Sequence, residues 1–151
     1  MTTNPLTATF VTVKVDNKPG TLGKCSRAIA NANINVESFF GDGATIRFLT
    51  NNPGGTVDAV KKAGFTAQTT DLFAIRLPNT PGQVAALGEE LGKVGVNIET
   101  CFSVGGTREN GRIFLLVNDP SKAQPVIERL STVQPTVGGR PTGGMSQPST
   151  M

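Results

Sequence analysis

Histidine, tryptophan and tyrosine are absent from this 151-residue sequence, and each absence excludes a class of function. Without histidine there is no imidazole to act as a general acid or base near neutral pH, or to bind a metal ion. Without tryptophan and tyrosine, a surface that stacks on nucleobases would depend on phenylalanine alone. The sequence therefore predicts neither a histidine-dependent enzyme nor a histidine metal centre, and we expect no cofactor.

Charged residues and long apolar runs are also scarce. Charged residues make up 17% of the chain, and 14 basic against 11 acidic residues give a net charge of +3. This charge is too small to indicate a protein that binds nucleic acid through its electrostatic field. No apolar run approaches the ~18 residues of a membrane span, and the N-terminus lacks the basic and apolar regions of a signal peptide. We expect neither a nucleic-acid partner nor a membrane.

The only cysteines, Cys25 and Cys101, are far apart in the sequence. Cys25 lies on a helical apolar stripe, which predicts a small core residue. Cys101 alternates with polar Asn97 and Glu99 along a predicted strand, so we expect it on their face and partly exposed. Two isolated cysteines are typical of a reducing compartment, and we expect a cytoplasmic protein.

The chain does contain an internal repeat. Asn17-Lys18-Pro19-Gly20 recurs as Asn79-Thr80-Pro81-Gly82, an offset of 79 − 17 = 62 residues, and Asn35-Val36-Glu37 recurs as Asn97-Ile98-Glu99 at the same offset. The apolar positions between these motifs repeat as well. A shared offset for turn, helix and strand residues indicates two copies of one small fold.

Each copy predicts the element order βαββαβ from its apolar periodicity. In the first copy we expect strands at 9–15, 34–40, 44–50 and 65–70, a helix at 20–33 and a short helix that ends at Gly64. In the second copy we expect strands at 71–77, 96–104, 112–118 and 132–137, and helices at 82–94 and 121–130. Five extra residues fall in the second hairpin, at 105–111. Gly88 and Gly92 within a helix indicate close helix packing.

The order βαββαβ is that of the ferredoxin-like sandwich, an α+β fold in which two helices cover one face of a four-stranded antiparallel sheet. We therefore predict two tandem domains at 8–70 and 71–137, followed by a disordered tail at 138–151. Units of about 65 residues bury too little surface to be stable alone, so we also expect a homo-oligomer.

The candidate site is the Asn-x-Pro-Gly loop that precedes the first helix of each copy. Pro19 ends the strand, and the missing side chain of Gly20 lets a ligand approach the backbone. The N–H groups of Thr21, Leu22 and Gly23 lack intrahelical partners and form an anion site at the helix N-terminus. Pro-Gly after Asn is also an ordinary strand-to-helix turn, so both interpretations stay open.

Backbone N–H groups suit a carboxylate and side-chain amide oxygens suit an ammonium, so the predicted ligand is a free amino acid. We prefer the second loop if only one is used, because its longer hairpin can fold over a ligand. The candidate residues are Asn17, Gly20, Thr21, Leu22 and Asn35 in the first copy, and Asn79, Gly82, Gln83, Val84 and Asn97 in the second.

These motifs, in this order, resemble the ACT domain, a small βαββαβ regulatory module, over residues 8–130. The chain is similar to stand-alone proteins made of two ACT domains with no enzyme attached. The resemblance implies a regulatory protein without catalytic activity that binds amino acids at interfaces between paired domains. In the serine-regulated phosphoglycerate dehydrogenases of the family, the effector contacts two asparagines, which correspond to Asn17 and Asn35, and to Asn79 and Asn97.

Those dehydrogenases also use a histidine on the strand just ahead of the loop. This chain has Val15 and Leu77 near that place. The resemblance therefore implies a more apolar effector than serine, such as a branched-chain or aromatic amino acid.

The main alternative is a regulatory subunit that acts by pairing with a metabolic enzyme. An RNA-binding βαββαβ domain would need exposed aromatic residues on the central strands and a basic Gly-aromatic motif, which the chain lacks. An acylphosphatase-like enzyme needs an arginine in its anion loop, and neither 17–20 nor 79–82 contains one. Glu37 and Glu99 resemble a catalytic pair, but their equivalent places in separate copies indicate exposed strand residues.

Overall fold

The computed structural model of the protein describes residues 6–105 and 111–131, and the statements that follow concern those residues. The strand expected at 132–137, the tail expected at 138–151 and most of the hairpin at 105–111 lie outside them. Those three expectations therefore stay predictions.

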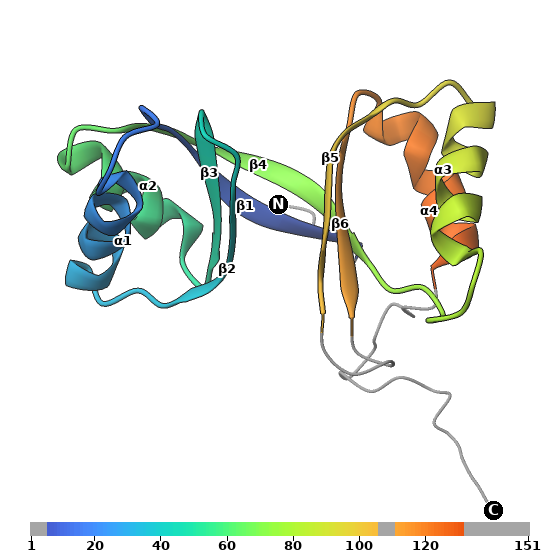
Figure 1. Cartoon of the computed structure of the whole chain (residues 1–151), viewed down its shortest axis with the longest axis horizontal. Helices are drawn as coiled ribbons and strands as arrows, with labels where there is room; N and C mark the ends of the chain where they lie inside the picture. Colours follow the sequence, from blue (N-terminus) through green and yellow to red (C-terminus); the bar gives the residue numbers. More distant parts are fainter. Residues whose placement is uncertain (1–5, 106–110, 132–151) are drawn as a thin grey trace, which may run out of the picture. The chain divides into compact units, whose positions relative to one another are not determined.

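The chain divides into two compact units, which Figure 1 shows coloured along the sequence. The first unit is Ala8–Asp71. The second unit consists of the described residues from Leu72 onward together with Leu6 and Thr7.

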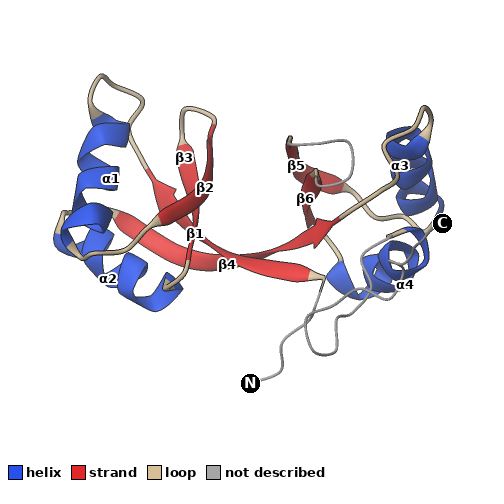
Figure 2. Cartoon of the chain, turned by 90° about the horizontal axis from the view of Figure 1, so that it is seen from below, coloured by secondary structure: helices blue, strands red, loops and turns tan. Residues whose placement is uncertain are grey.

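The first unit contains two helices and four strands in the order that the sequence predicts. Their bounds are β1 (Thr7–Lys14), α1 (Thr21–Asn31), β2 (Val36–Gly41), β3 (Thr45–Thr50), α2 (Pro53–Lys62) and β4 (Thr66–Ile75). The strand order is β2-β3-β1-β4. Both helices cover one face of these strands (Figure 2), which is the ferredoxin-like arrangement.

The second unit repeats this arrangement as far as it is described. After β4 come α3 (Gln83–Lys93), β5 (Ile98–Val104), β6 (Arg112–Val117) and α4 (Pro120–Leu130). The strand order is β4-β6-β5, and α3 and α4 cover one face (Figure 2). The predicted fold class, two tandem ferredoxin-like units, is confirmed.

Strand pairing repeats in register between the units. Val13 pairs with Ile46 in the first unit, and Ile75 pairs with Ile113 in the second. The first member of the pair moves by 75 − 13 = 62 residues and the second by 113 − 46 = 67. The difference of five equals the insertion predicted for the second hairpin, so the sequence repeat is also a structural repeat.

The junction between the copies differs from the expectation. The apolar periodicity predicts separate strands at 65–70 and 71–77, but Thr66–Ile75 is one continuous strand. No glycine or proline lies between Gly64 and Pro78 to interrupt it. As a result, β4 supplies strand residues to both units.

A β-bulge in β2 changes which side chains share a face. Simple alternation predicts Val36 and Phe40 on one face and Phe39 on the other. The pairing instead shifts between Val36 and Ser38, and such an extra residue reverses the alternation beyond it. Phe39 therefore pairs with Phe48 on the face that the helices cover, with ring centres 6.5 Å apart.

The same bulge recurs in the second unit, where the pairing of β5 shifts just after Ile98. Cys101 then pairs with Leu115, a residue of the core beneath the helices. Alternation predicts Cys101 on the face of Asn97 and Glu99. The bulge places it on the helix-covered face instead. Its side chain is exposed, as expected.

The core of the first unit lies between its sheet and its two helices. Cys25 is fully buried there, as predicted. Burial raises the pKa of the Cys25 thiol to about 11, so it stays protonated at neutral pH. The buried members of this core are Val11, Val13, Cys25, Ile29, Ile46, Phe48, Val60 and Ala67.

The core of the second unit includes a residue that the sequence analysis does not identify. Leu6 lies ahead of the predicted first strand, yet it is 4% exposed and belongs to the cluster that holds Leu87 and Leu91 of α3. Its carbonyl oxygen accepts the N–H of Ala74 at 2.6 Å. Leu6 therefore helps to build the second unit.

Candidate functional site

The loop glycines adopt a left-handed conformation at the start of the helices. Gly20 has φ 88° and Gly82 has φ 91°, and neither N-cap makes a side-chain hydrogen bond. A side chain at either glycine would meet no other atom within 4 Å, but its backbone would be strained. A valine at either position would be strained most, because β-branched residues rarely adopt this conformation.

The first loop is held by its own hydrogen bonds. The Thr21 hydroxyl lies 3.0 Å from the carbonyl oxygens of both Asp16 and Lys18, and the Thr21 N–H donates to the Lys18 oxygen. The Thr21 N–H is thus not available to a ligand, contrary to the expectation. Within the described residues, the N–H groups of Leu22 and Gly23 have no acceptor in the protein.

A pocket of about 340 Å³ lies between this loop and the β2–β3 hairpin, and we call it the first loop pocket. A Cβ on Gly43 would lie 3.6 Å from the Asn17 amide nitrogen, which places that amide against the hairpin turn. The turn itself is ordered by Asp42, whose carboxylate accepts the N–H and the hydroxyl of Thr45. The pocket is lined by Val15, Asp16, Asn17, Lys18, Gly20, Thr21, Leu22, Phe39, Gly41, Gly43 and Ile46.

The second unit has a pocket at the equivalent place, of about 270 Å³, which we call the second loop pocket. It contains the counterparts of first-pocket residues, including Asn79 for Asn17 and Val84 for Leu22. Small-molecule sites span about 300–1,000 Å³, so both pockets suit only a small ligand. The second loop pocket is lined by Leu77, Pro78, Asn79, Thr80, Gln83, Val84, Ser103, Val104, Gly105, Gly111, Arg112 and Ile113.

Exposed apolar side chains are concentrated at these two pockets. Five large hydrophobic side chains of the described residues are exposed, and four of them line a loop pocket. Leu22 is 44% and Phe39 55% exposed in the first, and Val84 is 70% and Val104 37% exposed in the second. The fifth is Val94. Apolar surface gathered in this way is typical of binding sites.

Asn35 and Asn97 lie away from the loop pockets. Val36, the neighbour of Asn35, pairs with Thr50 at one end of the β2–β3 ladder, whereas Gly41 and Ile46 of the first loop pocket pair at the other end. At ~3.3 Å per residue, a six-residue strand separates these ends by roughly 20 Å. A single unit therefore does not bring Asn17 and Asn35 together on one ligand.

Other types of site find little support in the described part of the chain. It holds no group of three or more cysteine, aspartate and glutamate side chains placed to bind a metal ion. None of its helices is both long and apolar enough to cross a membrane. The strand residues that RNA would stack on are each at most 4% exposed, so they offer no stacking surface; these residues are Phe10, Phe48, Phe73 and Phe114.

Comparison with known proteins identifies the family. The family model described as an ACT domain pair matches residues 6–134, and the chain belongs to this family. No curated protein sequence matches the chain.

Several solved structures share the fold. Protein BT0572 from Bacteroides thetaiotaomicron aligns with a TM-score of 0.72 at 23% identity, over 83% of this chain and 91% of that one. The regulatory subunit of aspartate kinase from Thermus thermophilus, in its ligand-free form, aligns at 0.55 and 16% identity, over 83% and 90%. A putative C-terminal regulatory domain of aspartate kinase from Porphyromonas gingivalis W83 aligns at 0.52 and 15% identity, over 86% and 100%.

Proposed function

We propose that this ACT domain pair is a regulatory protein without catalytic activity that binds a free amino acid in its loop pockets. The observation that carries the proposal is the recurrence of one pocket, with exposed apolar walls, at the Asn-x-Pro-Gly loop of both units. The names of the similar aspartate kinase regulatory chains support a regulatory role. The two free cysteines support a reducing compartment such as the cytoplasm.

The chemistry of the first loop pocket suits an amino acid with an apolar side chain. The unpaired N–H groups at the start of α1 can receive the carboxylate. The Asn17 amide oxygen can accept from the ammonium. Leu22, Phe39 and Ile46 supply an apolar wall for the side chain, and this favours a branched-chain or aromatic amino acid. If Asn35 also contacts the ligand, it comes from a second chain, consistent with the homo-oligomer that we propose.

A thermal-shift screen of the twenty amino acids at millimolar concentration, followed by calorimetry, tests the proposal. A ligand at 100 times its Kd adds ~2.7 kcal/mol to the free energy of unfolding, which is readily detected. We expect Leu22→Ser and Phe39→Ser to weaken binding at least tenfold, and Asn17→Ala to weaken it about threefold to tenfold. These side chains are exposed, so the substitutions leave the cores intact.

Val94→Ser is the matched control, because Val94 is 41% exposed and lies outside both loop pockets. It should leave the affinity unchanged. If no amino acid binds at millimolar concentration, or if Val94→Ser weakens binding as much as Leu22→Ser does, the amino-acid proposal fails. Static light scattering on the same samples tests the homo-oligomer, which a monomer at tens of micromolar would contradict.

The second candidate is a regulatory subunit that docks on a partner enzyme through the same apolar surface. The exposure of Val84, at 70%, favours it, because so open a side chain suits a broad partner surface better than a small ligand. In that case no amino acid binds, while Val84→Ser abolishes association with a metabolic enzyme that binds the wild-type chain. Calorimetry therefore distinguishes the two candidates.

A further inference from the structure

A second cavity in the first unit, of about 460 Å³, is lined by lysines, and we call it the lysine cavity. It is formed by the 17–20 loop together with the turn between α2 and β4, whereas the first loop pocket is formed with the β2–β3 hairpin. Lys14 comes from the end of β1, Lys18 from the loop and Lys24 from α1. Asp16 is the one carboxylate among its described lining residues, so their net charge is 3 − 1 = +2.

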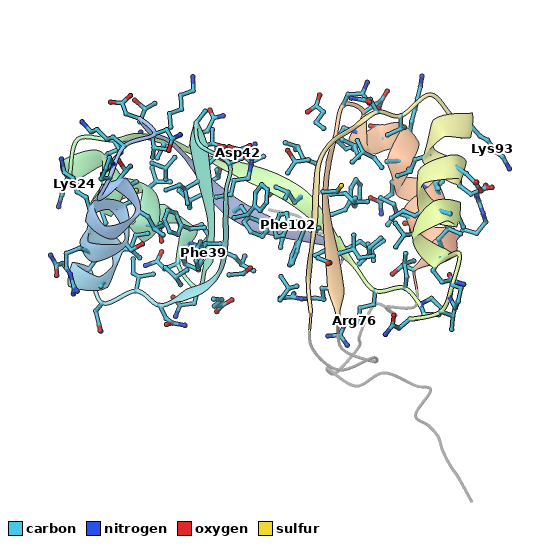
Figure 3. The ribbon with its side chains drawn as sticks, viewed as in Figure 1. Lys24, Phe39, Asp42, Arg76, Lys93 and Phe102 are labelled. Atoms are coloured by element: carbon cyan, nitrogen blue, oxygen red, sulfur yellow. The ribbon has the colours of Figure 1, made fainter. Side chains whose placement is uncertain are left out.

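No ion pair of the described residues uses these positive charges. The ion pairs of the described residues both involve Glu90 in the second unit, so none of the three lysines is paired with a carboxylate. The Lys24 ammonium lies 5.6 Å from the centre of the Phe65 ring, a cation–π contact that leaves its N–H groups available. Figure 3 labels Lys24 on α1. Three cations around one cavity repel each other, and a bound anion would relieve that repulsion.

The second unit shows that the lysines are not a requirement of the fold. At the offset of 62, Lys14, Lys18 and Lys24 correspond to Arg76, Thr80 and Ala86, so two of the three side chains lose their charge. The helix start is the same in both units, with a left-handed glycine at the N-cap. The start of the helix therefore does not distinguish the units, whereas the lysines do.

We propose that the lysine cavity binds the phosphoryl group of a small phosphate ester. A phosphate monoester carries close to two negative charges at neutral pH, which matches the net charge of the lining. Its compact group of oxygens can approach several ammonium groups at once, and lysine binds phosphate as a point charge. Phe65 offers an apolar surface for the organic part, and the volume lies within the range of small-molecule sites. The lysine cavity shares Val15, Asp16, Lys18, Gly20 and Thr21 with the first loop pocket, but Lys14, Lys24 and Phe65 line the lysine cavity alone.

The test is a titration of the full chain with glycerol phosphate in low salt, in which NMR amide chemical shifts report binding. We expect saturable binding at millimolar concentration, with shifts at Lys18, Gly64 and Phe65. The double substitution Lys18→Gln with Lys24→Gln should weaken binding at least tenfold, and 0.5 M sodium chloride should weaken it too, because these charges are exposed to screening.

The matched control is Lys62→Gln with Lys122→Gln, which removes the same charge from exposed positions outside the cavity and should change the affinity less than twofold. An equal loss in the control would mean attraction to net charge alone and would overturn the proposal. Chemical-shift changes of equal size at the start of α3 would also overturn it, as would binding that does not saturate with the ester. Succinate binding as tightly as the ester would overturn the assignment to a phosphoryl group. Lys24→Gln alone should leave amino-acid binding unchanged, because Lys24 is not in the first loop pocket.

Discussion

Gly20 and Gly82 have nearly the same backbone angles, with φ of 88° and 91° and ψ of −7° in both, although the loops around them differ in side chains. The N-caps of α2 and α4 agree as well. The Asn52 side chain accepts the N–H of Gly55, and the Asp119 side chain accepts the N–H of Lys122, in each case before a proline at the helix start. The backbone at the start of these helices is thus common to both units.

The side chains around that backbone diverge. The hydroxyl of Thr21 holds the first loop, whereas Gln83 at the equivalent place has no hydroxyl. Phe39 lines the first loop pocket, and its counterpart at the offset of 62 is Cys101. The comparison teaches that the repeat fixes where a pocket lies, while the lining residues decide the chemistry of that pocket. The two pockets therefore need not bind the same molecule.

The largest expected effect concerns the cores, because Leu6 belongs to the core of the second unit only. Leu6→Ala should lower the free energy of unfolding by roughly 2–3 kcal/mol, because Leu6 is 4% exposed and the change leaves a cavity in that core. Urea denaturation measures the loss, and hydrogen exchange should place it in α3 and α4.

The control for Leu6→Ala is Leu22→Ala, the same chemical change at a side chain that is 44% exposed. It should cost under about 0.5 kcal/mol. Loss of protection in α1 and α2 instead of α3 and α4 would show that Leu6 does not serve the second core.

The next effect tests the backbone that the units share. Gly20→Ala and Gly82→Ala should each lower the free energy of unfolding by about 1–2 kcal/mol, because each forces a side chain into a left-handed conformation. The two losses should be equal within the error of urea denaturation. Gly54→Ala, at a helix start with open space and an ordinary φ, should be nearly neutral. Clearly unequal losses at Gly20 and Gly82 would break the equivalence of the loops.

A smaller effect of opposite sign is expected inside α3. The sequence analysis interprets Gly88 and Gly92 as close packing, but a Cβ at either would meet no atom within 4 Å. That interpretation is wrong, and Gly88→Ala and Gly92→Ala should each raise the free energy of unfolding by ~0.5–1 kcal/mol through helix propensity. Gly23→Ala in α1, which has equal space, should do the same. Thermal melts check the sign, and a lower melting temperature would contradict the absence of contacts.

The fold could be predicted from the sequence because turn, helix and strand signals repeat at one offset. A single undivided fold would not produce such a common offset. The failures have local causes. The reversed faces of Phe39 and Cys101 come from bulges, which insert a residue without any glycine to mark them. The continuous β4 follows from a boundary between copies that carries no turn residue. Leu6 cannot be predicted in the same way, because a single apolar residue ahead of the strand pattern has no periodicity.

The site was predictable only in part. The Asn-x-Pro-Gly loop is a local motif, and the residues next to it in sequence do line the loop pockets. The hairpin walls, Phe39 and Ile46 in the first unit and Val104 and Ile113 in the second, are distant in sequence and depend on strand register. Asn35 and Asn97 recur together with the loop motif in the sequence. They lie at the other end of the strand ladders from the loop pockets, because the length of one strand separates the two places.

The smallest expected effect concerns an ion-pair group that only the second unit has. Glu90 lies 2.8 Å from the Lys93 ammonium and 2.9 Å from the Arg129 guanidinium. Lys93 first, and then Arg129, lowers the pKa of Glu90 below its ordinary value of 4.5. A lowered pKa in the folded state means that the pair stabilises the fold above pH 4.5 and that this contribution is lost as the pH falls through the lowered pKa.

Glu90→Gln should therefore lower the melting temperature slightly at pH 7 in low salt. The difference from wild type should shrink in high salt, because Lys93 and Arg129 are largely exposed. It should also vanish near pH 2, where both proteins carry a neutral side chain at this position. Thermal melts at both pH values and both salt concentrations measure it, with Glu128→Gln on α4 as an exposed carboxylate outside the group. A difference that persists at pH 2 would assign the effect of Glu90 to packing and not to its charge.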